Sequence, residues 1–404
     1  MQGLGVFIEV LFVFLKLGIR SFGGPVAHLG YFHETFVRKK GWISESDFAS
    51  TVALCQALPG PTSSQVGMVL GSTRAGGWGA AAAWIGFTLP SAVIMFFAGF
   101  SAISYPLAIP SGMLHGLKLA AIAVVADALH SMSVSLCPDQ PRKVLAAAVA
   151  LLAFAVEFQF ANIAMIFAGA VFGIFFLRKS MNVPQELNLI RFKTHLGILF
   201  LSVFFLLLFA LPAAARMVQN PLLILFDKCF RSGALVFGGG HVVLPLLENE
   251  FIAGQLVQRE TFLAGYGTAQ AVPGPLFSFA TFLGAASVPA GAGIGTAGLA
   301  SAIATVGIFA PSFLLLPGIF PLWKSIRKFA AVHCALAGIN ATVVGLLASV
   351  VMDSVASVAG DHYFSLVLVA VNLVLLKWAR WPSWLVVLLS AGLASTGGGT
   401  WARF

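Results

Sequence analysis

Charged residues are scarce in this chain. Asp, Glu, Lys and Arg make up 9% of its 404 residues, whereas 59% are hydrophobic. Soluble domains carry about 25% charged residues, so this composition excludes a soluble protein. The longest polar stretch is the loop at 178–193, which leaves no room for a hidden soluble domain. Apolar runs such as 80–100 and 196–211 instead predict helices that lie in a bilayer. We expect an all-α integral membrane protein.

Sequence signals for enzymatic chemistry are also missing. The chain has no Gly-Lys-Ser/Thr phosphate loop, no His-Glu-x-x-His and no Gly-x-Ser-x-Gly. We therefore predict no enzyme activity, and without a nucleotide site any transport must run on ion gradients or on the membrane potential. The 4 cysteines lack metal-ligand spacing and are predicted to be small packing residues: Cys55, Cys137, Cys229 and Cys334. Neither a metal site nor a cofactor is predicted.

A cleaved signal peptide and a nucleic-acid site are not predicted either. The first residues, Met1-Gln2-Gly3-Leu4, lack a basic region, and Glu9 interrupts the apolar run that follows them. The net charge of +9 forms no basic patch on a polar domain. In a membrane protein such residues mostly mark cytoplasmic loops.

What the chain does contain is a repeat of helix breakers. Gln56 precedes Leu58-Pro59-Gly60-Pro61, and Gln270 precedes Val272-Pro273-Gly274-Pro275, at an offset of 214 residues. Upstream lie glycine turns at an offset of 215, Phe22-Gly23-Gly24-Pro25 and Phe237-Gly238-Gly239-Gly240. Two further blocks match in the same order, Gly86-x-x-x-Pro90-Ser91 with Gly307-x-x-x-Pro311-Ser312, and Leu114-x-Gly116 with Leu336-x-Gly338. The common order of the matches predicts two homologous halves.

Hydrophobicity divides the chain further. We predict an N-terminal repeat at 1–180, a linker at 181–216 with one connecting transmembrane helix, and a C-terminal repeat at 217–404. Within the first repeat, 3–36 and 45–72 are predicted to be broken, re-entrant hairpins that enter from the cytoplasm. Full spans are then predicted at about 76–103, 110–136, 142–157, 160–177 and 194–213.

The distribution of Lys and Arg indicates how the halves are oriented. In the first half, Arg38-Lys39-Lys40 and Arg142-Lys143 flank apolar segments, while 101–110 carries no basic residue. In the second half the corresponding loops expose little besides Arg216 and Arg259. Because cytoplasmic loops are rich in Lys and Arg, we predict an inverted-topology repeat. If the breaker segments span the membrane fully, the count rises to roughly thirteen crossings, and the halves are still inverted.

The Pro-Gly-Pro breaks predict an anion site. Proline ends a helix and is well tolerated at the first position of the next one, so a half-helix is expected to start near Thr62. Its N-terminus presents unpaired N–H groups and the positive end of the helix dipole, and Thr62 and Ser63 add hydroxyls. The second copy, Pro275-Leu276-Phe277-Ser278, has fewer hydroxyls, so the two sites need not be equivalent. The alternative is that each break is only a kink relieved by its neighbours.

Other residues fit the same chemistry. Successive glycines let N–H groups converge on an anion. Basic residues within apolar segments usually face a cavity or a partner, which applies to Lys16, Lys118 and Arg231. Arg20 and Lys228 fit snorkelling toward the interface equally well. After the glycine turns, His28 and His241 fit anion donation, proton relay or plain packing. Candidate proton carriers are the acidic residues nearest apolar surroundings, Glu9, Glu34, Asp127 and Glu157.

These motifs resemble the chromate ion transporter family. The resemblance is carried by Gly18-x-x-Ser21-Phe22-Gly23-Gly24-Pro25-x-x-His28 and Gln56-Ala57-Leu58-Pro59-Gly60-Pro61, and by their second copies at 237–246 and 270–275. It covers almost the whole chain and both domains of the long form. It implies a multi-pass protein of the cell inner membrane that exports chromate with the proton-motive force and confers chromate resistance. Chromate is similar to sulfate in charge and shape, so sulfate is the expected competitor.

We therefore predict a secondary transporter with an oxyanion site between the halves near the membrane midplane, working by alternating access. Its predicted partners are chromate or a related oxyanion and the lipid bilayer, with no nucleic acid. The predicted substrate-binding residues are Lys16, Gly23, Gly24, Gln56, Gly60, Thr62, Ser63, Lys118, Arg231, Gly239, His241, Gln270 and Gly274. The predicted helix-breaking residues are Pro25, Pro59, Pro61, Pro273 and Pro275.

Three alternatives stay open at this point. The first is a transporter for another oxyanion such as sulfate, and the second is a passive anion channel on the same scaffold. The third is a membrane enzyme or assembly scaffold whose breaks only shape packing. Small-residue segments such as Gly291–Gly298 fit either internal packing or a homodimer.

Overall fold

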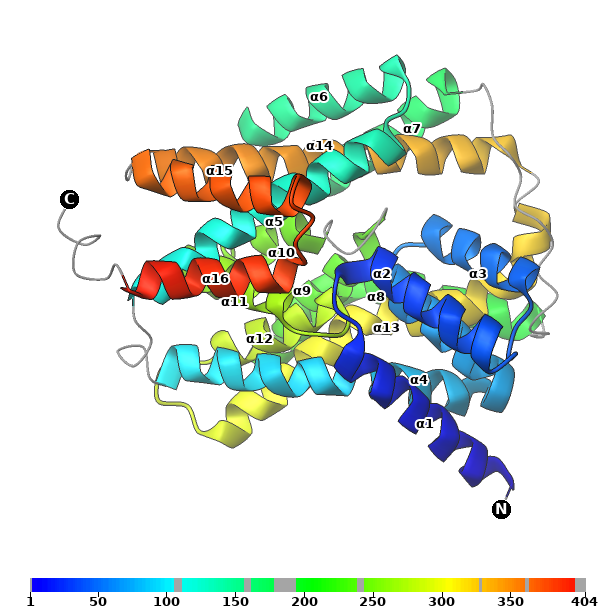
Figure 1. Ribbon diagram of the computed structural model, residues 1–404. Helices are drawn as coiled ribbons and strands as arrows, with labels where there is room; N and C mark the ends of the chain where they lie inside the picture. The colour runs from blue at the N-terminus through cyan, green and yellow to red at the C-terminus, as the bar shows by residue number, and fades with distance from the viewer. Residues whose placement is uncertain are drawn as a thin grey trace.

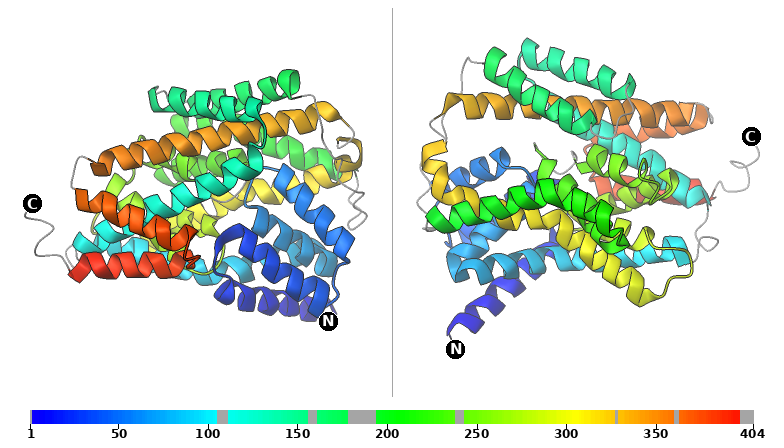
Figure 2. Two further views of the ribbon diagram at one scale, coloured as in Figure 1. Left: turned by 45° about the horizontal axis from the view of Figure 1, so that its top comes forward. Right: turned by 180° about the vertical axis from the view of Figure 1, so that it is seen from behind.

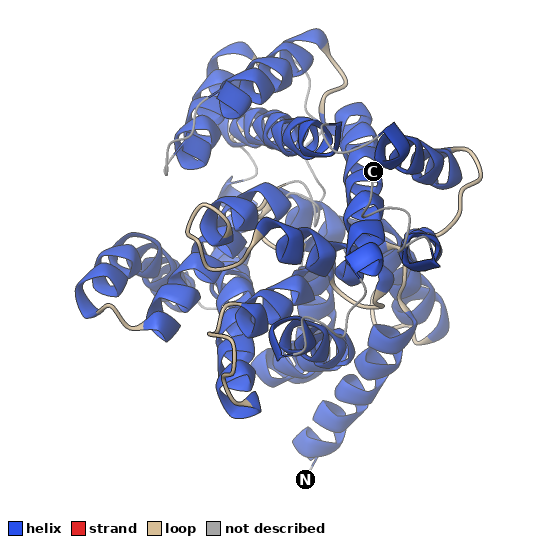
Figure 3. Ribbon diagram, turned by 90° about the vertical axis from the view of Figure 1, so that its left-hand side faces the viewer, coloured by secondary structure: helices blue, strands red, loops and turns tan. Residues whose placement is uncertain are grey.

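The computed structural model describes residues 2–104, 111–155, 161–177, 194–237, 243–326, 329–359 and 363–396. Every regular element in these ranges is helical, and Figure 3 draws no strand among them. The all-α prediction is therefore confirmed. The physical reason is that a helix satisfies its backbone N–H and C=O groups within one segment, which hydrocarbon demands.

The helices follow the predicted segments closely. The first half holds α1 (Gln2–Arg20), α2 (Gly24–Phe32), the π-helical segment η1 (His33–Lys39), α3 (Glu45–Ala57), α4 (Thr62–Ser104), α5 (Ser111–Leu136), α6 (Gln140–Ala155) and α7 (Ala161–Phe176). The connecting helix is α8 (Thr194–Val218). The second half holds α9 (Pro221–Leu235), α10 (Val243–Phe251), α11 (Arg259–Ala271), the 3-10 turn η3 (Leu276–Ser278), α12 (Phe279–Ala286), α13 (Ile294–Ile326), α14 (Ala330–Ala359), α15 (Tyr363–Lys377) and α16 (Ser383–Thr396).

The longest helix, α4, consists of two arms joined by a sharp turn. Ala75 and Gly76 have non-helical backbone angles, and Gly76 has a φ of 57°. The turn brings Gly71 against Gly79, where a Cβ at Gly71 would lie 2.2 Å from the carbonyl oxygen of Gly79. Only residues without a side chain allow this approach of two backbones. The second arm therefore starts where the predicted span at 76–103 starts.

Several helices are suited to a bilayer. Among the described residues, 5 helices are long and apolar enough to cross a membrane, namely α4, α5, α8, α13 and α14. Shorter apolar helices include α7, α15 and α16. Large apolar side chains are exposed on their outer faces, for example Phe209 and Leu206 on α8 and Phe175 on α7. So much exposed apolar surface requires a lipid environment, and the chain is a multi-pass membrane protein.

The two halves use matching helix contacts. α1 packs on α4 as α9 packs on α13, and α5 packs on α16 as α14 packs on α7. A Cβ at Gly18 would lie 2.7 Å from the carbonyl oxygen of Phe87, and one at the equivalent Gly233 would lie 2.1 Å from that of Ile308. Small residues at repeated positions thus set the same close packing twice.

The long helices form the frame that holds the broken ones. In Figure 1, α14 lies along α6 and α15 at the top of the view. The right-hand view of Figure 2 shows α8, in green, lying across α13, in yellow. The short helices on either side of the Pro-Gly-Pro motifs, α3, α11 and α12, contact α4, α5 and α13. The breaks therefore lie against long helices rather than at the periphery.

Candidate functional site

The two Pro-Gly-Pro loops each bind the backbone of the opposite half. The N–H of Gly60 donates to the carbonyl oxygen of Val236 at 2.7 Å, and the N–H of Gly274 donates to that of Ser21 at 2.9 Å. Gly60 is equivalent to Gly274 in the repeat, and Ser21 is equivalent to Val236. The same hydrogen bond is therefore made twice with the roles of the halves exchanged, and it places each break beside the residues that precede a glycine turn.

These glycines have a conformation that other residues avoid. Gly60 has a φ of 121° and Gly274 one of 102°. A Cβ at Gly60 would lie 2.7 Å from Ser312 Oγ, and a Cβ at Gly274 would lie 2.9 Å from Ser91 Oγ. Because the two serines are also equivalent in the repeat, each break faces a hydroxyl from the other half. In the first glycine turn, Gly23 has a φ of 96° and precedes α2, and Pro25 lies in the first turn of that helix.

The first arm of α4 begins with buried donors. Pro61 precedes Thr62, Ser63 and Ser64, whose side chains are all buried. The first N–H groups of a helix have no acceptor within it, so they point along the axis together with the positive end of the dipole. The Ser64 hydroxyl is also buried without a hydrogen-bond partner in the described part of the chain. An unpaired buried donor costs about 1–3 kcal/mol, so a bound anion would relieve this end of the helix.

His28 ties the first glycine turn to this helix start. It is fully buried, and its Nε2 lies 3.2 Å from the carbonyl oxygen of Ser21, which can only accept. The ring hydrogen is therefore on Nε2, and Nδ1 accepts from the Ser63 hydroxyl at 3.3 Å. Both ring nitrogens are used, so His28 holds Ser63 and the turn in place rather than donating to an anion itself.

Gln65 is a site residue that the sequence reasoning missed. It is fully buried, and its Nε2 donates to the carbonyl oxygen of Pro59 at 2.7 Å and to Ser312 Oγ at 3.2 Å. It therefore closes the loop around Gly60 and reaches the opposite half. One feature of the sequence could have identified Gln65. It places a polar amide in the turn directly after Pro-Gly-Pro, where the second half has Phe279.

The second half has an apolar version of this cluster. The positions equivalent to Ser21, His28, Ser63 and Gln65 are Val236, Val243, Phe277 and Phe279, all of them buried. The shared elements are the broken backbone, the glycine and the facing serine. The buried hydroxyls of Thr62 and Ser64, which could contact an anion, lie beside Gly60, where Gln65 holds the loop in place.

The basic candidates lie in three different surroundings. Lys16 is exposed on α1, and Lys118 is partly buried on α5. Arg231 is mostly buried on α9, where its Nη2 donates to Asp227 at 2.8 Å and to Glu250 at 3.1 Å. Lys228 completes this cluster through Glu250 at 3.2 Å. The charge of Arg231 is balanced inside the protein, which does not leave it for an anion.

The two glutamines before the breaks also differ. Gln56 is exposed at the end of α3, whereas Gln270 is buried at the end of α11 and hydrogen-bonds the Tyr266 side chain. The Nε2 of Gln270 has no partner in the described residues. Two predicted site residues, Gly239 and His241, lie outside the described residues.

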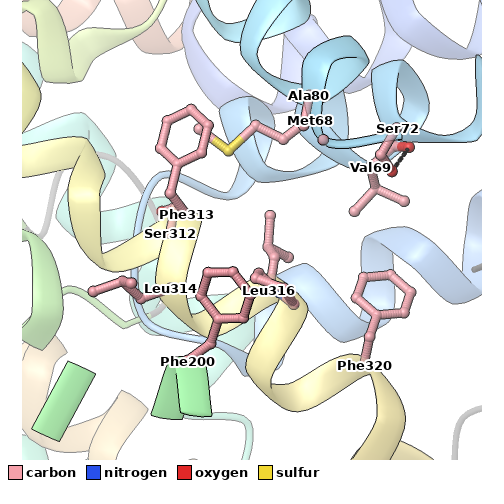
Figure 4. A pocket seen from close by; sticks show the side chains of 12 residues that line it. Met68, Val69, Ser72, Ala80, Phe200, Ser312, Phe313, Leu314, Leu316 and Phe320 are labelled. Atoms are coloured by element: carbon pink, nitrogen blue, oxygen red, sulfur yellow. Dashed lines mark hydrogen bonds between the residues drawn. The ribbon is translucent and has the colours of Figure 1, made fainter. Parts of the chain in front are cut away.

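An apolar cavity adjoins the cluster at Ser312. It measures about 290 Å³ and lies between α4, α8 and α13. Figure 4 shows Phe200, Phe313, Leu316 and Phe320 around it. The Ser72 hydroxyl in its wall already donates to the carbonyl oxygen of Val69 at 2.7 Å. These walls provide almost no hydrogen-bond donors for an anion, so the polar cluster beside Gly60 is the better candidate site.

Known proteins are similar to the chain over most of its length. The family model described as Chromate transporter matches residues 8–174 and 223–395. A chromate transport protein of Pseudomonas aeruginosa is 28% identical over 395 residues, covering 94% of this chain and 90% of that protein. An uncharacterized transporter of Methanocaldococcus jannaschii is 28% identical over 400 residues, covering 95% and 92%. A chromate transport protein of Cupriavidus metallidurans is 25% identical over 351 residues, covering 85% and 81%. No solved structure matches the chain.

Proposed function

The chain belongs to the chromate transporter family, and we propose that it is a secondary transporter that exports chromate across the cytoplasmic membrane. Similar proteins from Pseudomonas aeruginosa and Cupriavidus metallidurans are named chromate transport proteins. The family is one of transporters, and the chain has the membrane helices that transport needs. In the proposal, the proton-motive force drives export and the outcome for the cell is chromate resistance.

The observation that carries the proposal is the cluster of buried donors beside Gly60. Chromate is a tetrahedral dianion, and helix N-termini bind such groups through converging N–H donors. The N–H groups of the first turn of α4 and the hydroxyls of Thr62 and Ser64 would supply donors of this kind, while the Ser63 hydroxyl donates to His28. Gly23 and Gly24 would add backbone donors, and the exposed Lys16 and partly buried Lys118 would contribute positive charge.

Alternating access would follow from two inverted halves with re-entrant hairpins. α3 and α11 have 13 residues each, so each is about 20 Å long and falls short of a hydrocarbon core of about 30 Å. The exchanged hydrogen bonds of Gly60 and Gly274 support a two-fold relation between the halves. Rocking of one half on the other would open these contacts toward one side of the membrane at a time.

The direct test is chromate uptake into everted membrane vesicles that contain the chain. We expect uptake that requires a proton gradient and that excess sulfate suppresses. Uptake that ignores the gradient would indicate a passive channel on the same scaffold. If correctly inserted protein takes up no chromate, the proposed substrate is wrong, and sulfate and molybdate are then tested on the same vesicles.

The breaker motif itself is tested by two variants, Gln56→Ala and the double change Pro59→Ala with Pro61→Ala. Both are expected to abolish chromate transport and to leave the protein in the membrane. The first removes an exposed amide at the end of α3, and the second restores N–H donors and flexibility that the break excludes. Immunoblots of the membrane fraction give the amount of protein. Full transport in both variants would rule out a site at the break.

A further inference from the structure

Each half has an ion pair at the same place. In the first half, His33 Nε2 lies 2.7 Å from Glu45 Oε1, and Glu45 is the first residue of α3. In the second half, Arg259 Nη2 lies 3.2 Å from Glu248 Oε1, and Arg259 is the first residue of α11. His33 and Glu248 are 215 residues apart, and Glu45 and Arg259 are 214 apart, which are the offsets of the repeat. The first pair therefore connects η1 to α3, and the second connects α10 to α11. Each joins the helix that leads into Pro-Gly-Pro to the segment before it, with the acid and base exchanged.

The ion pair of the second half has two carboxylates but only one cation. Arg259 also pairs with Asp353 of α14, so one guanidinium serves two carboxylates. Asp353 is 48% exposed at its side chain, whereas Glu248 is only 14% exposed. The second oxygen of Glu248, Oε2, is buried without a hydrogen-bond partner in the described part of the chain. The uncompensated charge is thus on Glu248.

The other charged groups near α10 do not offset this excess. On α9, Asp227, Lys228 and Arg231 join Glu250 of α10 in a cluster of two acids and two bases. Glu260, next to Arg259 on α11, is exposed. Burial raises the pKa of Glu248 to about 7, with Arg259 opposing the rise and Asp353 adding to it. Because Glu248 is buried and shares the cation Arg259 with Asp353, its carboxyl is able to gain and lose a proton near neutral pH.

We propose that Glu248 is the proton-binding residue that couples anion export to the proton gradient, an inference that rests on the proposed function. When Glu248 accepts a proton, its charge attraction to Arg259 is lost and Arg259 stays with Asp353. The start of α11 is then freed from α10. α11 ends at the loop of Gly274, whose N–H is bonded to Ser21 beside His28, so the change reaches the anion site through one helix and one hydrogen bond.

The pair in the first half has an imidazole in place of the guanidinium. His33 Nε2 lies 2.7 Å and 2.9 Å from the two carboxylate oxygens of Glu45. The nearby Glu34 pairs with Arg38 and Lys39 on the same segment, and Asp47 of α3 accepts from Ser44. Because Glu45 is 73% exposed, this pair is weak in water. Coupling is therefore assigned to the buried pair, with the exposed one as its counterpart.

The test uses the purified chain in proteoliposomes with the membrane potential clamped. Chromate uptake is measured with and without a pH gradient, and a trapped pH dye reports proton movement. In Glu248→Gln, which keeps the shape but cannot titrate, we expect the stimulation by the gradient and the proton movement to be lost. Exchange of chromate at equal pH on both sides should persist. Glu250→Gln is the matched control, because it removes another carboxylate of α10 from the balanced cluster and should keep the response to the gradient.

Two further measurements separate this inference from the proposed function. Infrared difference spectra between acid and alkaline pH should show a carboxyl band that titrates near neutral pH and is absent in Glu248→Gln, whatever anion is carried. Glu248→Asp should keep the stimulation of uptake by the pH gradient, with a shifted midpoint in its pH dependence. This variant provides the test if Glu248→Gln fails to fold. Gradient-dependent uptake by Glu248→Gln, or a wild-type spectrum without such a band, would overturn the role of Glu248. Wild-type protein that moves no chromate contradicts the proposed function instead.

Discussion

Gly60→Ala is expected to abolish chromate uptake while the protein still reaches the membrane. Gly60 has a φ of 121°, a conformation that side chains rarely adopt. The new Cβ would lie 2.5 Å from Gln65 Nε2 and 2.7 Å from Ser312 Oγ. Overpacking of this kind costs about 1–3 kcal/mol, and strained backbone adds about 1–3 kcal/mol. Gln65 and Ser312 come from opposite halves, so relief of the clash would push the halves apart at the site.

Gly41→Ala separates the steric effect from backbone strain. Gly41 lies between η1 and α3 with a φ of 59°, and a Cβ there would meet nothing within 4 Å. We expect this variant to lose about 1–2 kcal/mol of stability from left-handed strain and to keep its transport. Uptake is normalised to the amount of protein in the membrane. Equal activity of Gly60→Ala and Gly41→Ala would show that the Gly60 loop is not part of the transport site.

The repeat made the backbone of the site predictable. Pro59, Gly60 and their second copies interrupt helices whatever surrounds them, because proline lacks an N–H and glycine tolerates positive φ. The helices α5, α6 and α7 lie where the sequence predicted spans, since each is a long apolar run between polar turns. Whether the halves are inverted in the membrane stays a prediction.

The side chains of the site were harder to predict. Arg231 looked like a lone cation in an apolar segment, yet its local partner Asp227 lies four residues earlier on one helical face, and its second partner Glu250 comes from another helix. Among the predicted proton carriers, Glu9 pairs with Lys40 and Arg74, and Glu157 lies outside the described residues. Glu248 was missed because its burial depends on tertiary packing and its next neighbours, Asn249 and Glu250, are polar.

The two halves match in the backbone of their breaks but differ in the side chains around them. Both breaks have a glycine with positive φ and a facing serine from the other half. Side-chain donors gather at the first break, while the second is packed with Phe277 and Phe279. A duplicated scaffold with one polar cluster favours a single anion site per chain over two.

Gln65→Leu should therefore reduce chromate transport much more than an equivalent change in the second half. Leucine is close to glutamine in volume, so the fully buried position stays filled. The change removes the bonds to Pro59 and Ser312 and leaves their oxygens buried, at a cost of about 1–3 kcal/mol. At 1.4 kcal/mol for each factor of ten, we expect roughly a tenfold to hundredfold loss, seen mainly in the KM for chromate.

Phe279→Leu is the matched control, because Phe279 occupies the equivalent position in the second half. It creates space in a fully buried core and should lower thermal stability, with little change in KM. Gln65→Glu adds the opposite test, since a negative charge beside the N-terminus of α4 would repel an incoming anion. Its carboxylate cannot donate to the carbonyl oxygen of Pro59, so this variant should lose thermal stability as well as chromate transport. If Gln65→Glu transports chromate with an unchanged KM, the anion binds elsewhere, and the unpaired donors at Ser64 and its neighbours serve only to shape the break.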